Sequence, residues 1–440
     1  MPQLSIVNRS GEAISCHRDA EGGVSEIIQP STTVAIQLPT LRLNLTLSPC
    51  VSDEKEKSTP VHDGWGSGLN GIVIGHSLTF GATWAVLKAS EGSPWIIYRL
   101  KITREHHYLL ILPRRDMTQY LSDIPDSVPL SSVTLPGTHD TMAFYGGSFA
   151  QCQSVDNPLA VQLSHGIRVL DIRLAVKKHR LMAYHGRYPQ KASFQDILAV
   201  IHAFLTSEQG RRETIVISIK EEDPPNEGFS TLVHREILKG PGGKAMWYLD
   251  NTVPTLGQVR GKIVLFSRFG ADAESWDGGD EGIGIHPTKW PDSVKEGFTW
   301  PCKNTTVRIH DWYRIPSFLY IPEKTELALS NMKPRPAEPQ TPTLAISFFS
   351  ASSFPFASPP TVARGFGWPQ AGVGVEGVNG RLARRLIDLL SGDDEYSQKG
   401  DPRLRGWVLL DFYNDPDPAL APLLVEFNFL GRVKGEEGWS

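Results

Sequence analysis

The first part of the chain is a series of short apolar segments separated by clusters of Gly, Ser, Pro and Asp. Examples are "LSIVNRS", "TTVAIQL", "LRLNLTL" and "PWIIYRLKI". Segments of this length and composition predict β-strands, and none of them has the spacing of apolar positions that marks a helix. Strands without helices bury their apolar faces against a second sheet. The pattern therefore predicts an all-β, sandwich-like domain over residues 1–117.

From Val128 onward the pattern changes, because short apolar segments alternate with helical ones. In "SFQDILAVIHAFLTSEQG", Phe194, Ile197 and Leu198 begin a series of apolar residues that falls on one helical face. The other apolar segments are nearly continuous, which is typical of parallel strands buried on both faces. They are "SSVTLPGTHD", "GIRVLDIRL", "RLMAYHG", "TIVISIKEE", "GKIVLFSRF", "TTVRIHDWY", "TLAISFF" and "RGWVLLDFYN". Eight strands with helices among them predict an α/β domain over residues 118–440, an irregular (β/α)8 TIM barrel.

Composition narrows the class of protein without naming a function. The 440 residues are 40% hydrophobic and 21% charged, which is ordinary for a globular protein of two or three domains. The net charge of -4 gives no electrostatic reason to expect nucleic acid. No apolar run is long enough for a transmembrane segment, and the first residues lack the apolar core of a secretory signal. We expect a cytoplasmic protein, with secretion by another route left open, and the sequence predicts no oligomeric state.

The four cysteines, Cys16, Cys50, Cys152 and Cys302, form no CxxC pair and have no spacing to histidines that is typical of zinc. We expect free thiols, no metal and no cofactor. A Cys16–Cys50 disulfide stays open for a protein that leaves the cell.

Polar residues stand at the ends of the predicted strands, where a barrel places its catalytic groups. Every strand except the seventh contributes one or more of them. They are His139, Asp140, Asp171, Arg173, His185, Lys220, Glu222, Arg268, Asp311, Tyr313 and Asp411. Solvation alone explains a polar residue at any single strand end. Two histidines, two arginines and several carboxylates on one rim are more than solvation requires.

These residue types suit the cleavage of a phosphodiester without a metal. Two histidines can serve as general base and general acid near neutral pH. An arginine binds phosphate through its planar fork of donors, and carboxylates fix the histidine tautomers. Tyr313 can stack on a sugar-like ring, while neighbouring charged residues hydrogen-bond its hydroxyls. The expected substrate has a hydroxyl-rich head group that carries a phosphodiester.

Several of these segments together resemble one family. "LPGTHDT", "VLDIR", "YHG", "IVISIKEE", "RGKIVLFSR", "HDWY" and "GWVLLDFYN" are similar to motifs of the bacterial-type phosphatidylinositol-specific phospholipases C, in the same order. The resemblance runs from about residue 130 to about residue 430. It implies a TIM barrel that converts phosphatidylinositol into diacylglycerol and a 1,2-cyclic inositol phosphate, with slow hydrolysis of the cyclic ester as a second step.

The resemblance also implies a role for each site residue. His139 is the general base that takes the proton of the inositol 2-hydroxyl, and Asp411 orients it. His185 is the general acid that protonates the departing oxygen, and Asp140 supports it. Arg173 binds the phosphate beside Asp171. The inositol-binding wall consists of Lys220, Glu222, Arg268, Asp311 and Tyr313.

Some features separate this chain from parts of the family. Calcium-dependent relatives have an acidic metal ligand where this chain has Arg173, which favours the metal-independent class. The segment "AFYGGSFAQCQSVDNP" has no Trp-bearing interfacial helix like that of the secreted enzymes. Aromatic residues on the rim loops either touch a lipid interface, as a peripheral membrane enzyme requires, or pack the loops onto the barrel. They are Trp276, Trp290, Trp300, Phe348, Phe349, Phe354 and Phe356.

Two further interpretations of function stay open beside phosphatidylinositol cleavage. One is the same chemistry on glycosylated or lyso inositol lipids. The other is a catalytically silent protein that binds phosphoinositide or glycan. A silent protein is expected to lose a histidine or the arginine, and this chain has all of them.

Overall fold

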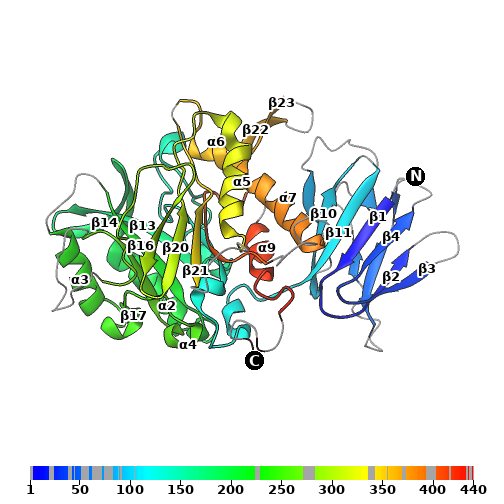
Figure 1. Cartoon of the computed structure of the whole chain (residues 1–440), viewed down its shortest axis with the longest axis horizontal. Helices are drawn as coiled ribbons and strands as arrows, with labels where there is room; N and C mark the ends of the chain where they lie inside the picture. The colour runs from blue at the N-terminus through cyan, green and yellow to red at the C-terminus, as the bar shows by residue number, and fades with distance from the viewer. Residues whose placement is uncertain are drawn as a thin grey trace. The chain divides into compact units, whose positions relative to one another are not determined.

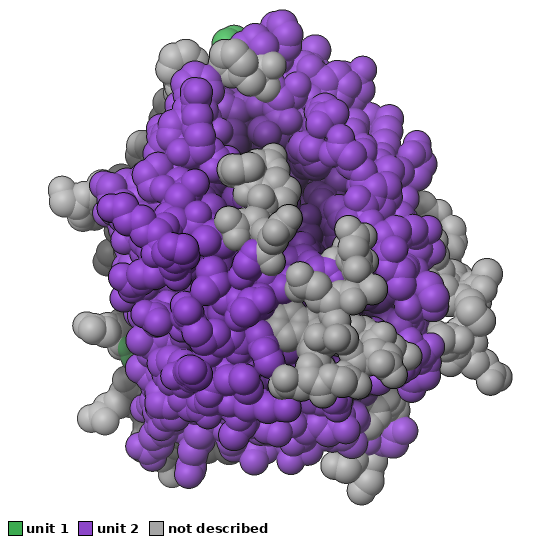
Figure 2. Space-filling model, turned by 90° about the vertical axis from the view of Figure 1, so that its left-hand side faces the viewer, with its two compact units in different colours: residues 1–115, 367–374, 380–402 green, residues 116–366, 375–379, 403–440 purple. Residues whose placement is uncertain are grey.

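The computed structural model describes most of the chain. The described residues are 3–18, 24–37, 42–43, 45–50, 59–61, 72–73, 83–87, 89, 92–103, 105–222, 228–270, 283–334, 342–353, 355–368, 373–392, 403–415, 418–432, 435 and 439. They divide into two compact units. Unit 1 is residues 1–115, 367–374 and 380–402, and unit 2 is residues 116–366, 375–379 and 403–440 (Figure 2).

The described residues before 116 form strands that pair into sheets. The strands are β1 Gln3–Asn8, β2 Ile14–Arg18, β3 Val24–Ile28, β4 Thr33–Gln37, β5 Arg42–Leu43, β6 Leu45–Pro49, β7 Thr59–Val61, β8 Ile72–Val73, β9 Trp84–Leu87, β10 Trp95–Lys101 and β11 His106–Pro113. One sheet has the order β4-β1-β11-β10-β9, another has the order β3-β2-β6-β7, and β5 pairs with β8. Apolar residues of the two larger sheets, such as Ile6 and Leu47, share one buried cluster.

The extent of this N-terminal region as a domain stays a prediction. The compact unit that contains these strands also takes in residues 367–374 and 380–402. Most of helix α7, Val378–Ser391, lies in the second of those segments.

Unit 2 is built on one curled sheet (Figure 1). Its strands are β12 Thr134–Thr138, β13 Val169–Lys177, β14 Arg180–His185, β15 Tyr188–Ser193, β16 Ile215–Glu221, β17 Trp247–Tyr248, β18 Ile263–Arg268, β19 Phe298–Cys302, β20 Thr305–His310, β21 Thr343–Phe348 and β24 Gly406–Leu410. The order along the sheet is β17-β18-β16-β13-β12-β24-β21-β20-β19. From β18 to β20 all neighbouring strands are parallel, as continuous apolar strands require.

Helices lie outside this sheet. They are α1 Leu159–Ser164, α2 Phe194–Thr206, α3 Phe229–Lys239, α4 Leu256–Val259, α5 Ile321–Met332, α6 Pro359–Arg364 and α9 Leu420–Glu426. Ser193 and Asp196 cap the start of α2 reciprocally, and its apolar face is buried, as its periodicity predicts. Helix α5 packs against β20 and β21, and α9 packs against β12. The strands β22 Gly365–Trp368 and β23 Val373–Glu376 pair in a separate two-stranded sheet. Among the described residues, no helix is long and apolar enough to cross a membrane.

The predicted α/β class is confirmed, but the regular eight-stranded barrel is not. All eight predicted segments are strands. The third, β14, is antiparallel to β13 and continues into a hairpin with β15, so it is not a member of the parallel series. Among the described residues, no ladder joins β18 to β20, and the sheet is a curled half-barrel.

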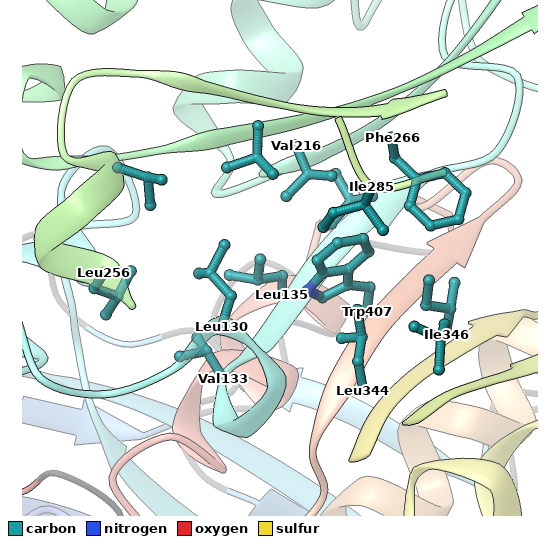
Figure 3. Close-up of a cluster of buried hydrophobic side chains, with 14 of the residues drawn as sticks. Leu130, Val133, Leu135, Val216, Leu256, Phe266, Ile285, Leu344, Ile346 and Trp407 are labelled. Carbon is teal, nitrogen blue, oxygen red and sulfur yellow. The ribbon is translucent and has the colours of Figure 1, made fainter. Parts of the chain in front are cut away.

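The inside of the curled sheet is filled by apolar side chains, one to three from each parallel strand. Figure 3 shows Leu135, Val216, Phe266, Ile346 and Trp407 pointing toward one another. Residues of the short 3-10 helices η2 (Tyr120–Asp123) and η3 (Leu130–Ser132) belong to the same cluster. This core occupies the interior, so only the C-terminal ends of the strands are left to form a site.

A buried ion pair, Arg168 with Glu213, anchors the segment of the chain that leads into unit 2. The Arg168 Nε donates to Glu213 at 2.8 Å, and neither side chain is exposed to solvent. The other nitrogens of Arg168 donate to four backbone carbonyls, including those of Met117 and Thr118. All donors of the guanidinium therefore have acceptors inside the protein, and the chain before η2 is tied to the start of β13.

Arg168→Met should lower the free energy of unfolding by about 3–5 kcal/mol, because it leaves the Glu213 carboxylate buried without its partner. Urea unfolding measures this loss. Arg212→Met is the matched control, because it breaks the exposed pair with Asp126 and should cost at most about 1 kcal/mol. Equal losses in the two variants would contradict this account of the buried pair.

Candidate active site

The end of β12 is shaped so that two polar residues can follow it directly. A side chain at Gly137 would lie 2.6 Å from the Val169 Cβ and 2.8 Å from the Val408 carbonyl oxygen, so only glycine allows the three strands to pack this closely. Asp140 has a φ of 39°, in the left-handed region that Asp tolerates better than most residues. After the tight turn, the His139 side chain contacts Asp411 and the Asp140 side chain contacts His185.

His139 is held at both ring nitrogens. Its Nδ1 lies 2.8 Å from the Asp411 Oδ1, at the end of β24, and its Nε2 lies 2.6 Å from the Arg173 Nη2. Because Arg173 can only donate, Nε2 is the acceptor and Nδ1 carries the proton. Burial lowers the pKa of His139 well below its ordinary value, and the charge of Arg173 lowers it further. His139 is therefore a neutral imidazole.

Burial also acts on the partner of His139. It raises the pKa of Asp411 well above its ordinary value, and the nearby Asp140 raises it further. The Asp411 Oδ2 is buried and has no hydrogen-bond partner among the described residues. If His139 becomes protonated, its positive charge would stabilise the ionised form of Asp411, and the two groups would form an ion pair.

Arg173 is surrounded by carboxylates. Its Nε donates to the Asp171 Oδ2 at 3.1 Å and lies 3.7 Å from the Asp140 Oδ2, and its Nη1 lies 3.6 Å from the Glu222 Oε1. Burial alone would lower the pKa of Arg173, but these carboxylates raise it well above its ordinary value. Burial alone would raise the pKa of Asp171, but Arg173 and Arg268 lower it. The guanidinium is therefore charged and fixed in place.

His185 reaches the site although its strand is antiparallel. The register pairs Leu174 of β13 with Ala183 of β14, so the returning strand runs back along β13 and brings His185 to the same cavity as Arg173. The His185 Nδ1 lies 2.7 Å from the carbonyl oxygen of Ala150 and 3.3 Å from the Asp140 Oδ2. Nδ1 therefore carries a proton, and Nε2 is the nitrogen left for other partners.

The structure brings all the predicted site residues together. A cavity of about 300 Å³ is lined by His139, Arg173, His185, Lys220, Arg268, Asp311, Tyr313 and Asp411. The remaining three, Asp140, Asp171 and Glu222, contact residues of this lining. Figure 2 shows that one face of unit 2 is hollowed.

Further contacts order the side of the cavity predicted to bind the head group. Glu222 accepts from the Gly186 amide at 2.8 Å and lies 3.5 Å from the Lys220 Nζ. The charge of Arg173, followed by burial, lowers the pKa of Lys220. The Tyr313 hydroxyl donates to the Asp292 Oδ1 at 2.5 Å. These residues present both donors and acceptors, which suits a ligand rich in hydroxyls.

Several residues of the cavity were not assigned to the site from the sequence, although Trp290 was named among the rim aromatics. Trp290 donates to the Asp311 Oδ2 at 3.0 Å and lies under the Arg268 guanidinium, 3.8 Å from its ring centre. Ser350 follows the seventh strand, where no polar residue was assigned, although "SFFSASS" contains serines. Cys152 lines the cavity between the two histidines, and its Sγ lies 3.9 Å from the His185 Nδ1. Burial raises the pKa of the Cys152 thiol well above its ordinary value.

The rim aromatics differ in their exposure to solvent. Trp300 in β19 and Phe348 in β21 are buried in the core cluster, and Phe349 is buried directly after β21. Phe356 is 62% exposed. Trp276 and Phe354 lie outside the described residues.

Comparisons with known proteins agree with this fold. Residues 127–269 match the model of the family described as phosphatidylinositol-specific phospholipase C, X domain. A curated protein of Listeria monocytogenes named 1-phosphatidylinositol phosphodiesterase is 35% identical over 162 residues, which are 34% of this chain and 48% of that protein. One of the same name from Staphylococcus aureus is 24% identical over 246 residues, covering 53% of this chain and 75% of that protein. The chain thus matches about half the length of the first of these relatives.

Solved structures show the same fold. The phosphatidylinositol-specific phospholipase C of S. aureus has a TM-score of 0.54 at 20% identity, over 71% of this chain and 98% of that one. The enzyme of L. monocytogenes has a TM-score of 0.51 at 24% identity, over 71% and 99%. Fold and site thus define an α/β half-barrel protein with paired histidines and an arginine at its strand ends. Residues 127–269 match the phosphatidylinositol-specific phospholipase C X domain, and the resemblance stated from the sequence is confirmed.

The raised pKa of one carboxyl group in the site, that of Asp140, makes the free energy of unfolding depend on pH. Burial raises the pKa of Asp140 from its ordinary 3.8 to about 6, against the opposing charges of His185 and Arg173. A raised carboxyl pKa favours folding below the unfolded value and loses this contribution as the pH rises through the folded value. Each pKa unit corresponds to about 1.4 kcal/mol, so the ionised Asp140 costs the folded state about 3 kcal/mol above about pH 6.

Asp140→Asn should therefore raise the free energy of unfolding by about 3 kcal/mol at about pH 8, since the amide resembles the protonated carboxyl. The gain should shrink as the pH falls from about 6 toward about 4. Urea unfolding at several pH values measures it, with the exposed Asp156→Asn as control. A gain that is absent at about pH 8, or constant with pH, would contradict the assignment.

Proposed function

We propose that the protein cleaves the phosphodiester of inositol phospholipids by intramolecular transphosphorylation, without a metal ion. The products are diacylglycerol and inositol 1,2-cyclic phosphate. The observation that carries the proposal is the geometry of His139, Arg173 and His185 on one cavity. Each histidine is held at Nδ1, so proton transfer falls to Nε2, which in His139 is occupied by an Arg173 donor until a phosphate binds. The names of the relatives support the substrate class.

Proton removal falls to His139. Its Nδ1 proton is held by Asp411, so the Nε2 lone pair can accept the proton of the inositol 2-hydroxyl. Without substrate, an Arg173 donor occupies that lone pair at 2.6 Å. A phosphodiester that binds Arg173 draws the donor to its own oxygens and adds a negative charge nearby. Both changes increase the basicity of His139, so the base becomes active when the phosphate is in place.

Proton delivery falls to His185. As the 2-oxygen attacks phosphorus, the bond to the diacylglycerol oxygen breaks, and this oxygen needs a proton. Asp140 lies 3.3 Å from Nδ1, and the protonated His185 ring can give its Nε2 proton to the leaving oxygen. For the slow hydrolysis of the cyclic ester, His185 takes a proton from water and His139 returns one to the 2-oxygen.

Arg173 supplies the positive charge for the phosphoryl group in transit. Its position is fixed by Asp171, Asp140 and Glu222, so no reorganisation is needed when negative charge builds up on the phosphate. The head group is proposed to lie against Lys220, Arg268 and the other wall residues. An exposed Phe356 on the loop that follows the cavity residue Ser352 is proposed to contact the lipid surface.

His139→Ala and His185→Ala should each lower the rate of diacylglycerol release from phosphatidylinositol micelles by about 10²–10⁴-fold, because each removes one proton-transfer partner. His202→Ala, on helix α2, is the matched control and should leave the rate unchanged. Full activity in either site variant would overturn the proposal.

A second substrate separates the two roles. An inositol phosphodiester with a phenol-type leaving group needs little protonation of that group. It should restore much of the rate of His185→Ala and little of the rate of His139→Ala. The reverse pattern would mean that base and acid have been exchanged.

A further inference from the structure

We propose that Asp140, Cys152 and His185 form a site for a zinc ion, and that zinc bound there inhibits the enzyme. The three side chains come from the turn after β12, the loop before α1 and the end of β14. Their donor atoms are a carboxylate oxygen, a thiol sulfur and a ring nitrogen, and all lie within 4.8 Å of one another. The inhibition, though not the binding, rests on the proposed function.

The distances suit tetrahedral coordination with little movement. The His185 Nδ1 lies 3.3 Å from the Asp140 Oδ2 and 3.9 Å from the Cys152 Sγ. Zinc bonds of about 2.0–2.3 Å place tetrahedral ligand atoms about 3.3–3.8 Å apart. Closure by about 1 Å or less completes three positions and leaves the fourth to water.

An unused acceptor points to a ligand at this place. Asp140 is 1% exposed, and its Oδ2 accepts no hydrogen bond from the described residues. Its electrostatic neighbours are Arg173 at 3.7 Å and the His185 ring. Arg173 also faces Asp171 and Glu222, so the carboxylates offset its repulsion of a cation. A bound zinc would give the Oδ2 the direct partner that it lacks.

The donor set selects the kind of metal. A thiolate and an imidazole favour zinc over magnesium or calcium, which prefer oxygen ligands. On binding, the ion displaces the thiol proton of Cys152 and the Nδ1 proton that His185 shares with the Ala150 carbonyl oxygen. The ring then no longer carries the imidazolium charge needed to donate a proton. Zinc would thus remove the general acid while leaving the rest of the cavity in place.

Binding is tested with Co²⁺ as a probe, because cobalt bound to a thiolate absorbs in the near ultraviolet. The full chain should show this absorption, and zinc should abolish it by displacement. Cys152→Ala and Cys152→Ser should lose it, with cobalt affinity reduced about 100-fold or more, since even the loss of an outer partner costs up to that amount. Cys302→Ala is the matched control, because Cys302 is also buried and its Sγ lies 3.5–3.6 Å from oxygen atoms of Asn251. No absorption in the full chain, or the same absorption in the Cys152 variants, would overturn the proposal.

Inhibition is tested by the rate with zinc divided by the rate of the same variant in EDTA. This ratio should fall with zinc in the full chain and in Cys302→Ala, and should stay near one in Cys152→Ser. Equal inhibition of Cys152→Ser would place the inhibitory zinc elsewhere and contradict the proposal. If no lipid is cleaved at all, the proposed function fails, while the cobalt measurement still decides whether the site binds metal.

Discussion

The contact between Arg173 and the buried Asp171 is the interaction on which the site depends. Asp171 also accepts from the Asp140 amide at 3.1 Å and lies 3.5 Å from Arg268, so one carboxylate ties β12, β13 and β18 together. It keeps a guanidinium charged at the end of a packed sheet, where burial would otherwise disfavour a charge. Burial lowers the pKa of His139, and this fixed charge lowers it further, so His139 is neutral. Without substrate, the Arg173 charge lowers the basicity of His139, and a bound phosphodiester would interact with this same charge.

The strands of unit 2 could be predicted from the sequence because each is a nearly continuous apolar run with turn residues at its ends. Their direction could not. "RLMAYHG" has the same apolar character as its neighbours, and only the short turn at Lys178 and His179, both with positive φ, returns it antiparallel to β13. A two-residue turn cannot make the crossover that parallel strands need. Reading the lengths of the connections would have identified the hairpin.

The candidate site was predictable for a different reason. Residues at the ends of parallel strands meet on one edge whatever the details of packing, so His139, Arg173 and Asp411 converge as expected. Trp290 and Cys152 lie on loops, and their places depend on how those loops fold back. Loop residues have no periodic sequence pattern from which their position in the cavity could be predicted. The hydrogen bond from His185 to the Ala150 carbonyl was missed likewise, because any residue can supply a backbone oxygen.

The central claim is that this arrangement splits the ester through the inositol 2-oxygen, using only protein side chains. Phosphorus NMR of the full chain with phosphatidylinositol in detergent micelles and excess EDTA tests it most directly. The account predicts early accumulation of a five-membered cyclic phosphate, followed by slow conversion to a monoester. Direct formation of the monoester, or a reaction that stops in EDTA and returns with calcium, would contradict it.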